Sequence, residues 1–339
     1  MGKISDYSIA TIGSHTALQI LDGAKTEGFK TIVVCLKGRE RPYLNFGVAD
    51  EVIVINNMSE FDTVEAQLMK RNAILIPHGS FVEYYGPERV EKLKMMHYGT
   101  KGILKWEADR NKEREWLKDA GLQLPKIFKN PDDIDRPVII KFHGASGGQN
   151  YFIANSPNDF YEQIEKYNPL DKDYVIQEYI VGVPMYAHYF YSRLRNELEI
   201  MSFDKRYESN ADSIGRIRAS DQLAAHIRTS YTVAGNIPLV IRESLLPEFY
   251  EMGDRVVETA LDREKTGLFG PFCLEGIIDP NLNFIVFEIS ARIVAGTNPY
   301  IEGSPYTWLK YHEPMSTGRR IAMDIREAIE QDKIDLVLG

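Results

Sequence analysis

Two carboxylates stand inside apolar stretches near the C-terminal end of the chain. Glu275 lies in the run 272–278, and Glu288 lies in the run 283–289. The segment 279–282 between them contains the Asp, Pro and Asn that favour a hairpin turn. Antiparallel pairing can bring both carboxylates onto one face, close enough to share a hard divalent cation. Because a buried, unpaired carboxylate is costly, we expect a cation beside these groups.

Ser290 and Arg292 follow Glu288 at two-residue steps, so all three side chains point the same way on an extended chain. A carboxylate, a hydroxyl and a guanidinium on one face suit a Mg²⁺-bound polyphosphate. Glu288 and Arg292 are therefore candidate catalytic residues. The alternative is a plain ion pair, such as Glu288 with Arg292, and these residues alone do not decide between the two interpretations.

A second group of residues suits phosphate binding. The apolar run 136–142 carries a single lysine, Lys141, and leads through the Gly-rich segment 143–150 into the short apolar run 151–154. Strand, glycine turn and strand predict a β flap, whose backbone N–H groups can lie over phosphates with Lys141 as a point charge. The alternative is a lysine that extends from the strand into solvent beside a flexible hairpin.

The N-terminal part of the chain must position a third group. Strand-like runs at 7–12, 31–36, 51–55 and 73–77, with helical stretches at 16–27 and 61–70, predict a doubly wound parallel sheet. Ligands of such sheets bind at the carboxyl ends of the strands, where His15 and Ser80 occur. No dinucleotide fingerprint is present. Helix capping by Ser14 or Thr16 is the simpler alternative for this segment.

Two further polar segments have ambiguous roles. The charged segment 204–210, which includes Glu208, and the cations of 215–218 predict a loop that forms a surface ion-pair cluster or holds an anion. Gly235 and Asn236 predict a turn, in which Asn236 either contacts a ligand or caps its own backbone.

Composition limits the function classes. The 339 residues are enough for two or three domains. The 49 acidic and 40 basic residues give a net charge of −9, which argues against nucleic acid as a partner. Only two cysteines occur, both in apolar runs, and no apolar run reaches the ~18 residues of a membrane span. We therefore expect a cytoplasmic protein with no membrane partner.

The order of these motifs resembles the ATP-grasp superfamily. A closer resemblance is to the archaeal PurP family, which forms 5-formaminoimidazole-4-carboxamide ribonucleotide (FAICAR). The strings that carry it are GSHTALQIL at 13–21, PHGSF at 77–81, KRYESN at 205–210, GNIP at 235–238, RESLL at 242–246 and FEISAR at 287–292. The resemblance extends from about residue 8 to residue 335 of the chain.

The resemblance implies a fold and an activity. The fold class is α/β and α+β: a doubly wound parallel sheet, called a pre-ATP-grasp domain, followed by a two-lobed ATP-grasp fold. The implied domains are 1–100 on the side of 5-aminoimidazole-4-carboxamide ribonucleotide (AICAR) and 101–339 for ATP grasp, with a flap lobe at 125–185 and a metal and substrate lobe at 186–339. The implied enzyme is an ATP- and formate-dependent carbon–nitrogen ligase. It converts AICAR to FAICAR through formyl phosphate in purine biosynthesis and releases ADP and phosphate.

The resemblance also implies site residues and partners. The implied partners are ATP, formate and AICAR, with Mg²⁺ or Mn²⁺. The resemblance also suggests a homo-oligomer, for which a trimer and a hexamer are two candidates, and the sequence leaves the oligomeric state open. The implied AICAR contacts are His15, Ser80 and Asn236. The implied ATP contacts are Lys141, Gln177, Glu178, Ile180, Tyr186 and Glu208. The implied metal ligands are Glu275 and Glu288.

The flap departs from the family pattern. Ser146, Gln149 and Asn150 replace two cations and a glycine that are usual there, which leaves the acyl donor and the ATP affinity open. Two alternatives therefore remain beside the formate-dependent ligase. One is a paralogous ATP-grasp ligase with a different acid or amine, and the other is a nucleotide-binding regulator without turnover.

Overall fold

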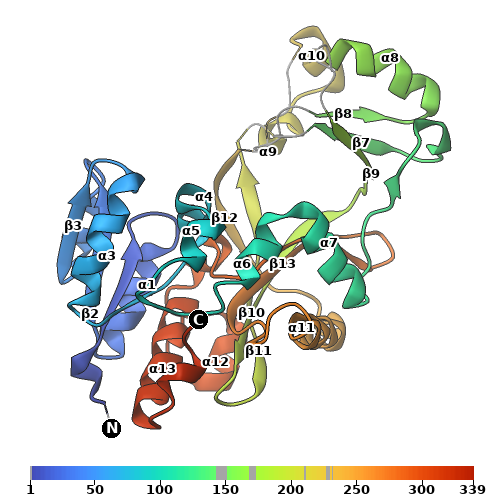
Figure 1. The fold of residues 1–339 in the computed structure, drawn as a ribbon. Coiled ribbons are helices and arrows are strands. Elements are labelled where there is room, and N and C mark those ends of the chain that lie inside the picture. Colours follow the sequence, from blue (N-terminus) through green and yellow to red (C-terminus); the bar gives the residue numbers. More distant parts are fainter. Residues whose placement is uncertain (1, 143–150, 168–172, 210, 227–229, 231) are drawn as a thin grey trace.

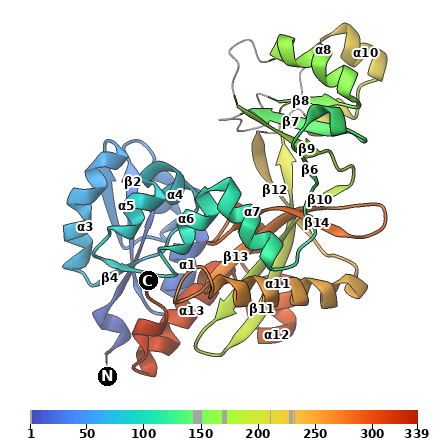
Figure 2. The same ribbon diagram turned by 45° about the vertical axis from the view of Figure 1, so that its right-hand side comes forward.

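The computed structural model describes residues 2–142, 151–167, 173–209, 211–226, 230 and 232–339. Its strands form three sheets that follow one another along the chain. In Figure 1 the blue N-terminal sheet lies beside the yellow and orange C-terminal sheet, while the green middle sheet stands above them. Figure 2 shows the same separation from a second direction.

The first sheet has five parallel strands in the order β3-β2-β1-β4-β5. They are β1 (Ser8–Ile12), β2 (Lys30–Leu36), β3 (Glu51–Ile55), β4 (Ala73–Leu75) and β5 (Met96–His97). The four predicted strands are confirmed to within two residues. The fifth was not predicted, because two residues carry no periodic signal. The associated helices are η1 (Ile4–Asp6), α1 (Ala17–Thr26), α2 (Arg41–Phe46), η2 (Met58–Glu60), α3 (Phe61–Met69), α4 (Gly79–Tyr85) and α5 (Pro87–Glu91).

The C-terminal helix α13 (Thr317–Glu330) covers one face of the first sheet and crosses α1. At the crossing the two backbones touch through glycines. A Cβ on Gly23 would lie 2.2 Å from the backbone nitrogen of Arg319, and a Cβ on Gly318 would lie 2.1 Å from the carbonyl oxygen of Gln19. Ile321 and Ile325 of α13 pack with Ile9 and other residues of the first sheet. The two ends of the chain therefore share one core.

A helical bridge leads to the second sheet. It contains α6 (Ile103–Ala108), α7 (Arg110–Asp119) and η3 (Pro131–Asp133). The second sheet is antiparallel in the order β6-β9-β7-β8 and is covered by α8 (Pro157–Tyr167). Its strands are β6 (Ile127–Phe128), β7 (Val138–Phe142), β8 (Tyr151–Ala154) and β9 (Tyr174–Glu178). The predicted flap turn with Ser146, Gln149 and Asn150 lies outside the described residues.

The third sheet is antiparallel in the order β12-β11-β10-β13-β14. Its strands are β10 (Val183–Ser192), β11 (Glu197–Glu208), β12 (Val233–Leu239), β13 (Gly270–Ile278) and β14 (Phe284–Ser290). The helix α11 (Leu246–Ala260) packs Phe249 against Phe203 and Phe284 on one face. The remaining short helices are α9 (Ala211–Ile214), α10 (Ala219–Ala224), η4 (Glu243–Leu245), η5 (Ala295–Tyr300), α12 (Pro305–Tyr311) and η6 (Ile334–Leu336).

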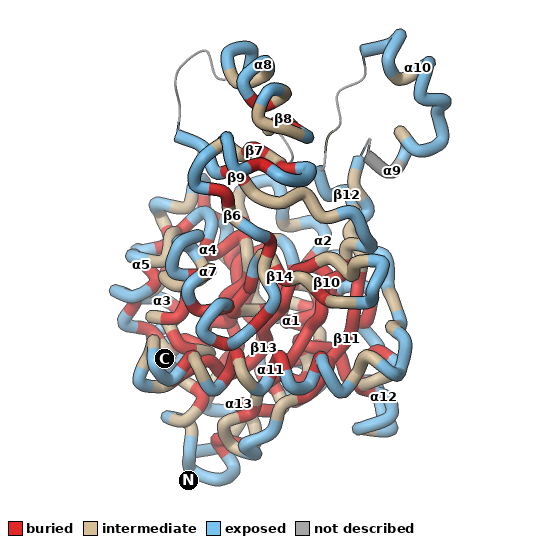
Figure 3. The backbone as a smooth tube through the Cα atoms, turned by 90° about the vertical axis from the view of Figure 1, so that its right-hand side faces the viewer, coloured by how far each residue is buried: buried red, intermediate tan, exposed pale blue. Residues whose placement is uncertain are grey.

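Two sequence predictions are wrong in this sheet. Residues 204–208 form the end of β11 and not a loop, and Gly235 and Asn236 lie inside β12 and not in a turn. Charge density and a glycine favour a loop in the sequence, but pairing between β11 and β12 places these residues in a ladder. Figure 3 shows that buried residues concentrate where the first and third sheets lie, below the middle sheet. The predicted domain boundaries stay predictions.

Candidate active site

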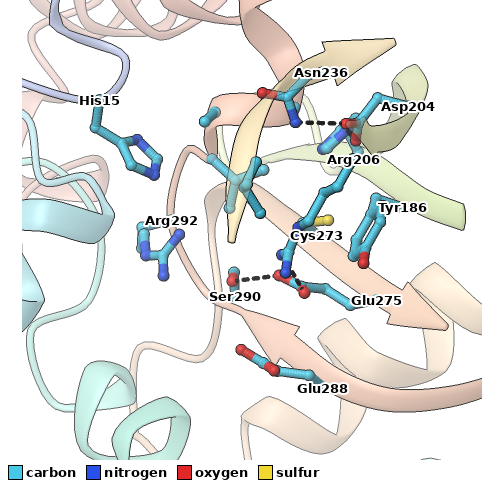
Figure 4. A pocket seen from close by; sticks show the side chains of 15 residues that line it. His15, Tyr186, Asp204, Arg206, Asn236, Cys273, Glu275, Glu288, Ser290 and Arg292 are labelled. Atoms are coloured by element: carbon cyan, nitrogen blue, oxygen red, sulfur yellow. Dashed lines mark hydrogen bonds and ion pairs between the residues drawn. The ribbon is translucent and has the colours of Figure 1, made fainter. Parts of the chain in front are cut away.

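A cavity of about 350 Å³ lies on the face of the third sheet that α11 does not cover. Every strand of the sheet contributes to it, and His15 from the loop after β1 closes one side (Figure 4). The segment 294–296, at the start of η5, closes another side. The side chains contributed by the five strands are Tyr186, His188, Asp204, Arg206, Val233, Asn236, Cys273, Glu275, Glu288 and Ser290.

The alternation of side chains along each strand explains this composition. Asp204 and Arg206 are two residues apart on β11, so both reach the cavity, while Phe203 between β11 and α11 is fully buried. The strands β10, β13 and β14 repeat this two-residue spacing. The sheet is thus apolar on the α11 side and polar on the cavity side.

The two acids of the hairpin are paired as predicted. Glu275 lies directly opposite Glu288 in the register of β13 and β14. Glu275 is buried, forms an ion pair with Arg206 and accepts a hydrogen bond from the Ser290 hydroxyl at 3.2 Å. Glu288 is exposed to solvent, and the like charge of Glu275 directly across the ladder raises the pKa of Glu288 to about 7. An added cation would relieve this repulsion.

The alternative ion pair of Glu288 with Arg292 is wrong, because Arg292 pairs with Glu107 instead. Arg292 Nη2 lies 2.8 Å from Glu107 Oε1, and the other carboxylate oxygen of Glu107 accepts the backbone N–H of Ala291 at 2.8 Å. Glu107 belongs to α6, so the bridge helix fixes both the backbone and the side chain just after β14. Sequence reasoning missed this role of Glu107.

A second acid from the bridge supports β14. Glu113 of α7 is buried and accepts the backbone N–H of Ile289 at 2.6 Å. Burial, and then the charge of Glu288, raise the pKa of Glu113 to about 9. The charged face of α7 is therefore not wholly exposed to solvent. Glu113 lies three and four residues before the buried Trp116 and Leu117, and this spacing was the signal that could have identified it.

Two stacked histidines lie at the carboxyl ends of the strands of the first sheet. The rings of His15 and His78 are 5.3 Å apart at their centroids and nearly parallel. Burial lowers the pKa of His78 to about 4. The pKa of His15, whose side chain is exposed, is also lowered, by partial desolvation and by the charges of His78 and Arg292, so both rings are neutral at physiological pH. His15 has a backbone φ of 54°, a left-handed conformation that is rare outside glycine. The His15 carbonyl accepts a hydrogen bond from Asn298 Nδ2 at 3.0 Å.

Ser80 lines a neighbouring cavity of about 340 Å³ between α4, α5 and α6. Its hydroxyl is 3.1 Å from that of Ser14. His15 and Arg292 line both cavities, so they stand at the junction between them. The structure therefore brings His15, Ser80 and Asn236 to two adjoining cavities.

The six predicted ATP contacts fall into two groups. Tyr186 lines the first cavity, with the Arg206 guanidinium 4.2 Å from its ring centroid. None of the other five lines that cavity. The second sheet carries Lys141, Gln177 and Glu178, and Ile180 follows its strand β9. The fifth residue, Glu208, is the last residue of β11.

Contacts within the second sheet hold two of these side chains. Lys141 Nζ is 3.5 Å from Gln177 Oε1. Burial and the positive charge of Arg110 lower the pKa of Lys141, while the negative charge of Glu288 opposes this shift. Glu178 accepts from Arg136 at 2.9 Å and from the backbone of Lys126 at 3.0 Å. The role of each residue stays a prediction.

Within the described part of the chain, no three or more His, Cys, Asp and Glu side chains gather as a metal centre. The assignment of Glu275 and Glu288 as metal ligands stays a prediction. No helix among the described residues has both the length and the apolar character needed to cross a membrane.

Two family models match the chain. The model described as "Domain of unknown function (DUF1297)" matches residues 162–339, and "Protein of unknown function (DUF1246)" matches residues 9–128. The chain is 56% identical over 337 residues to the 5-formaminoimidazole-4-carboxamide-1-(beta)-D-ribofuranosyl 5'-monophosphate synthetase of Pyrococcus abyssi, and the match covers 98% of each protein. It is 46% identical over 344 residues to the synthetase of the same name from Methanocaldococcus jannaschii, with 98% and 95% covered.

Solved structures agree with these relatives. The IMP biosynthesis protein PurP from Thermococcus kodakaraensis matches with a TM-score of 0.78 and 30% identity, over 98% of this chain and all of that one. The N5-carboxyaminoimidazole synthetase from Staphylococcus aureus, solved with ADP, matches with a TM-score of 0.65 and 17% identity, over 94% and 77%, and shows the fold alone. The predicted fold class, a parallel sheet followed by an ATP-grasp fold, is confirmed. The chain belongs to the family of 5-formaminoimidazole-4-carboxamide ribonucleotide synthetases.

Proposed function

We propose that this protein is an ATP- and formate-dependent ligase that converts AICAR to FAICAR in purine biosynthesis. The observation that carries the proposal is the composition of one cavity, in which His15 of the first sheet faces Glu275 and Glu288 of the third. The relatives that match the whole chain bear the name of this activity. The site therefore combines the polar groups expected for a ribonucleotide with the acid pair expected for a nucleotide-bound cation.

The chemistry proceeds in two transfers. An oxygen of formate attacks the terminal phosphorus of ATP, the bond to ADP breaks, and formyl phosphate forms. The amine of AICAR then attacks the formyl carbon, phosphate leaves, and the nitrogen loses a proton to give FAICAR. Formate needs the phosphate because a carboxylate is a poor electrophile. The protein mainly holds the reactants together and stabilises charge.

The chain supplies no nucleophile of its own in this scheme. Cys273 lines the cavity, but burial raises the pKa of its thiol well above the ordinary value. It therefore stays a thiol, which is a weak nucleophile. This agrees with direct transfer from formyl phosphate to the amine of AICAR.

The residues present fit a divalent cation. Glu275 and Glu288 would hold it, since their carboxylates lie opposite each other and their mutual repulsion raises the pKa of Glu288. When bound, Mg²⁺ or Mn²⁺ neutralises charge on the phosphates of ATP. Arg292, held by Glu107, adds a fixed guanidinium at the junction of the two cavities and would contact the transferred phosphate.

The remaining residues would bind the two nucleotides. His15, Ser80 and Asn236 would contact AICAR, and neutral His15 offers one donor and one acceptor. The residues that would contact ATP are Lys141, Gln177, Glu178, Ile180, Tyr186 and Glu208. Glu275 and Glu288 share the first cavity with His15 and Asn236 of one set and with Tyr186 of the other.

A phosphate-release assay tests this function. The purified protein should release phosphate from ATP only when Mg²⁺, formate and AICAR are all present, and FAICAR should appear in equal amount. Glu288→Gln serves as the inactive control. Acetate or other small acids in place of formate test the paralogue with a different acyl donor. Phosphate release that does not depend on AICAR would refute the proposed function.

A further inference from the structure

Three polar side chains on adjacent strands form a hydrogen-bonded row at one end of the first cavity. They are His188 of β10, Asp204 of β11 and Asn236 of β12. His188 Nε2 lies 2.7 Å from Asp204 Oδ1, and Asn236 Nδ2 lies 2.7 Å from Asp204 Oδ2. The side chains of His188 and Asp204 are only 2% and 1% exposed. Asp204 is thus a buried carboxylate with one partner on each oxygen.

The chemistry of a carboxylate fixes which way the neighbours point. An ionised carboxylate only accepts hydrogen bonds, so His188 must donate from Nε2 and Asn236 must donate from its amide nitrogen. The amide oxygen of Asn236 then faces away from Asp204. In Figure 4 this oxygen is directed to the side away from Asp204, where His15 lies across the cavity. No hydrogen bond to that oxygen is found among the described residues.

We propose that Asp204, held by His188, is a positioning residue that turns the Asn236 amide so that it presents an acceptor to the substrate. This inference rests on the proposed function. Asn236 therefore takes an N–H or O–H group of AICAR, which means its amine, its carboxamide or a ribose hydroxyl. The ionised phosphate of AICAR carries acceptors only, so it is excluded from the amide oxygen of Asn236.

The surrounding backbone keeps Asp204 in this orientation. A Cβ on Gly296 would lie 2.1 Å from Asp204 Oδ1 and 2.7 Å from His188 Cε1, so η5 crosses the pair where only glycine fits. Tyr300 of η5 is anchored to the sheet, since its hydroxyl donates to the carbonyl of Phe203 and accepts the N–H of Leu239 at 2.8 Å. The segment 296–300 thus packs against Asp204 and holds its side chain in this orientation.

Asp204→Asn is the discriminating substitution. The new amide at position 204 can still accept from His188, but its nitrogen then faces the nitrogen of Asn236. Two rearrangements relieve this contact. Asn236 can flip, which replaces the acceptor in the cavity by a donor, or the amide at 204 can turn while His188 moves its proton from Nε2 to Nδ1. The second leaves a buried N–H on Nδ1 without a partner among the described residues, so the flip of Asn236 is favoured. We expect the Kd and the KM for AICAR to rise about tenfold or more, because a substrate donor is left unpaired. The Kd for ATP should stay within twofold of the parent value.

An exchange variant separates orientation from general damage. In the double variant Asp204→Asn, Asn236→Asp, the amide at 204 donates to the carboxylate at 236, whose second oxygen again faces the cavity. The AICAR affinity should return to within a few-fold of the parent value. His188→Gln, which keeps a donor near the place of Nε2, should bind AICAR more tightly than His188→Leu, which has none.

Calorimetry measures the affinities of each variant for AICAR and ATP, and the phosphate-release assay measures its turnover. If the parent is active and Asp204→Asn binds AICAR as tightly as the parent does, the positioning role of Asp204 is refuted while the proposed function stands. The same holds if the double variant binds AICAR no more tightly than Asp204→Asn. If the parent protein neither binds AICAR nor turns it over, the proposed function fails and the assignment fails with it. Thermal unfolding of each variant shows whether a loss of affinity reflects loss of the fold.

Discussion

Replacing Glu288 with glutamine should make the empty protein more stable while it stops catalysis. Glu275 lies directly across the hairpin, and its charge raises the pKa of Glu288. A raised pKa means that folding favours the protonated form. The stability that this group contributes is therefore fully present below its unfolded pKa and is lost as the pH rises through its folded pKa. At neutral pH the charge on Glu288 destabilises the fold.

The distance between the two acids sets how much the free energy of unfolding rises in Glu288→Gln. Side chains directly opposite on antiparallel strands are about 5 Å apart. Two like charges at that distance repel by about 1–3 kcal/mol for an effective dielectric constant between 80 and 20. Glu288 is open to solvent and Arg206 offsets part of the charge of Glu275, so the gain should be about 1 kcal/mol. For a chain of this size that corresponds to a Tm about 2 °C higher.

The assay is thermal unfolding at pH 8 and at pH 4, with and without Mg²⁺ and ATP. Without ligand, Glu288→Gln should melt above the parent at pH 8, and the difference should vanish at pH 4. With Mg²⁺ and ATP the order should reverse, because the parent binds the ion and the variant does not. Glu251→Gln, an exposed position on α11, is the matched control. A variant that turns over normally, or that melts below the parent at pH 8, would refute this reasoning.

Three further predictions concern the same cavities. His15→Ala should raise the KM for AICAR and leave the Kd for ATP unchanged; equal effects on both ligands in calorimetry would speak against its assignment to AICAR. Glu107→Gln should lower kcat about tenfold or more with a smaller change in either KM, because the partner of Arg292 loses its charge; stopped-flow or steady-state rates equal to those of the parent would contradict this. Glu288 must be ionised to hold the cation, and its pKa is raised above that of an ordinary glutamate. As the pH is lowered, the activity should therefore begin to fall at a higher pH than it would with an unperturbed glutamate at this position. A pH–rate profile that is flat down to pH 5 would count against the metal assignment.

The chain pattern was enough to predict the parallel sheet and the hairpin with opposed acids. These features depend on the spacing of apolar residues and on turn residues, which are local. Glu275 and Glu288 were identified because a charge inside an apolar run is conspicuous by itself. The resemblance to a family then joined them to His15, Ser80 and Asn236.

Residues whose role depends on a distant partner could not be found in this way. Glu107 and Glu113 look like surface acids of a charged bridge, and only the packing of α6 and α7 against β14 makes them supports of the hairpin. Asp204 and Asn236 were assigned to a loop and a turn because charge and glycine outweighed strand propensity there. The ladder between β11 and β12, which places them in one row, involves residues about 30 positions apart.

The shared core of α1 and α13 has a consequence for the order in which the protein folds during its synthesis. The cluster that contains Ile321 and Ile325 also includes Ile20 of α1, so it is completed only after α13 has been synthesised. The close fit of Gly23 and Gly318 likewise joins residues from opposite ends of the chain. A truncation before residue 317 therefore removes part of the core on which the first sheet packs.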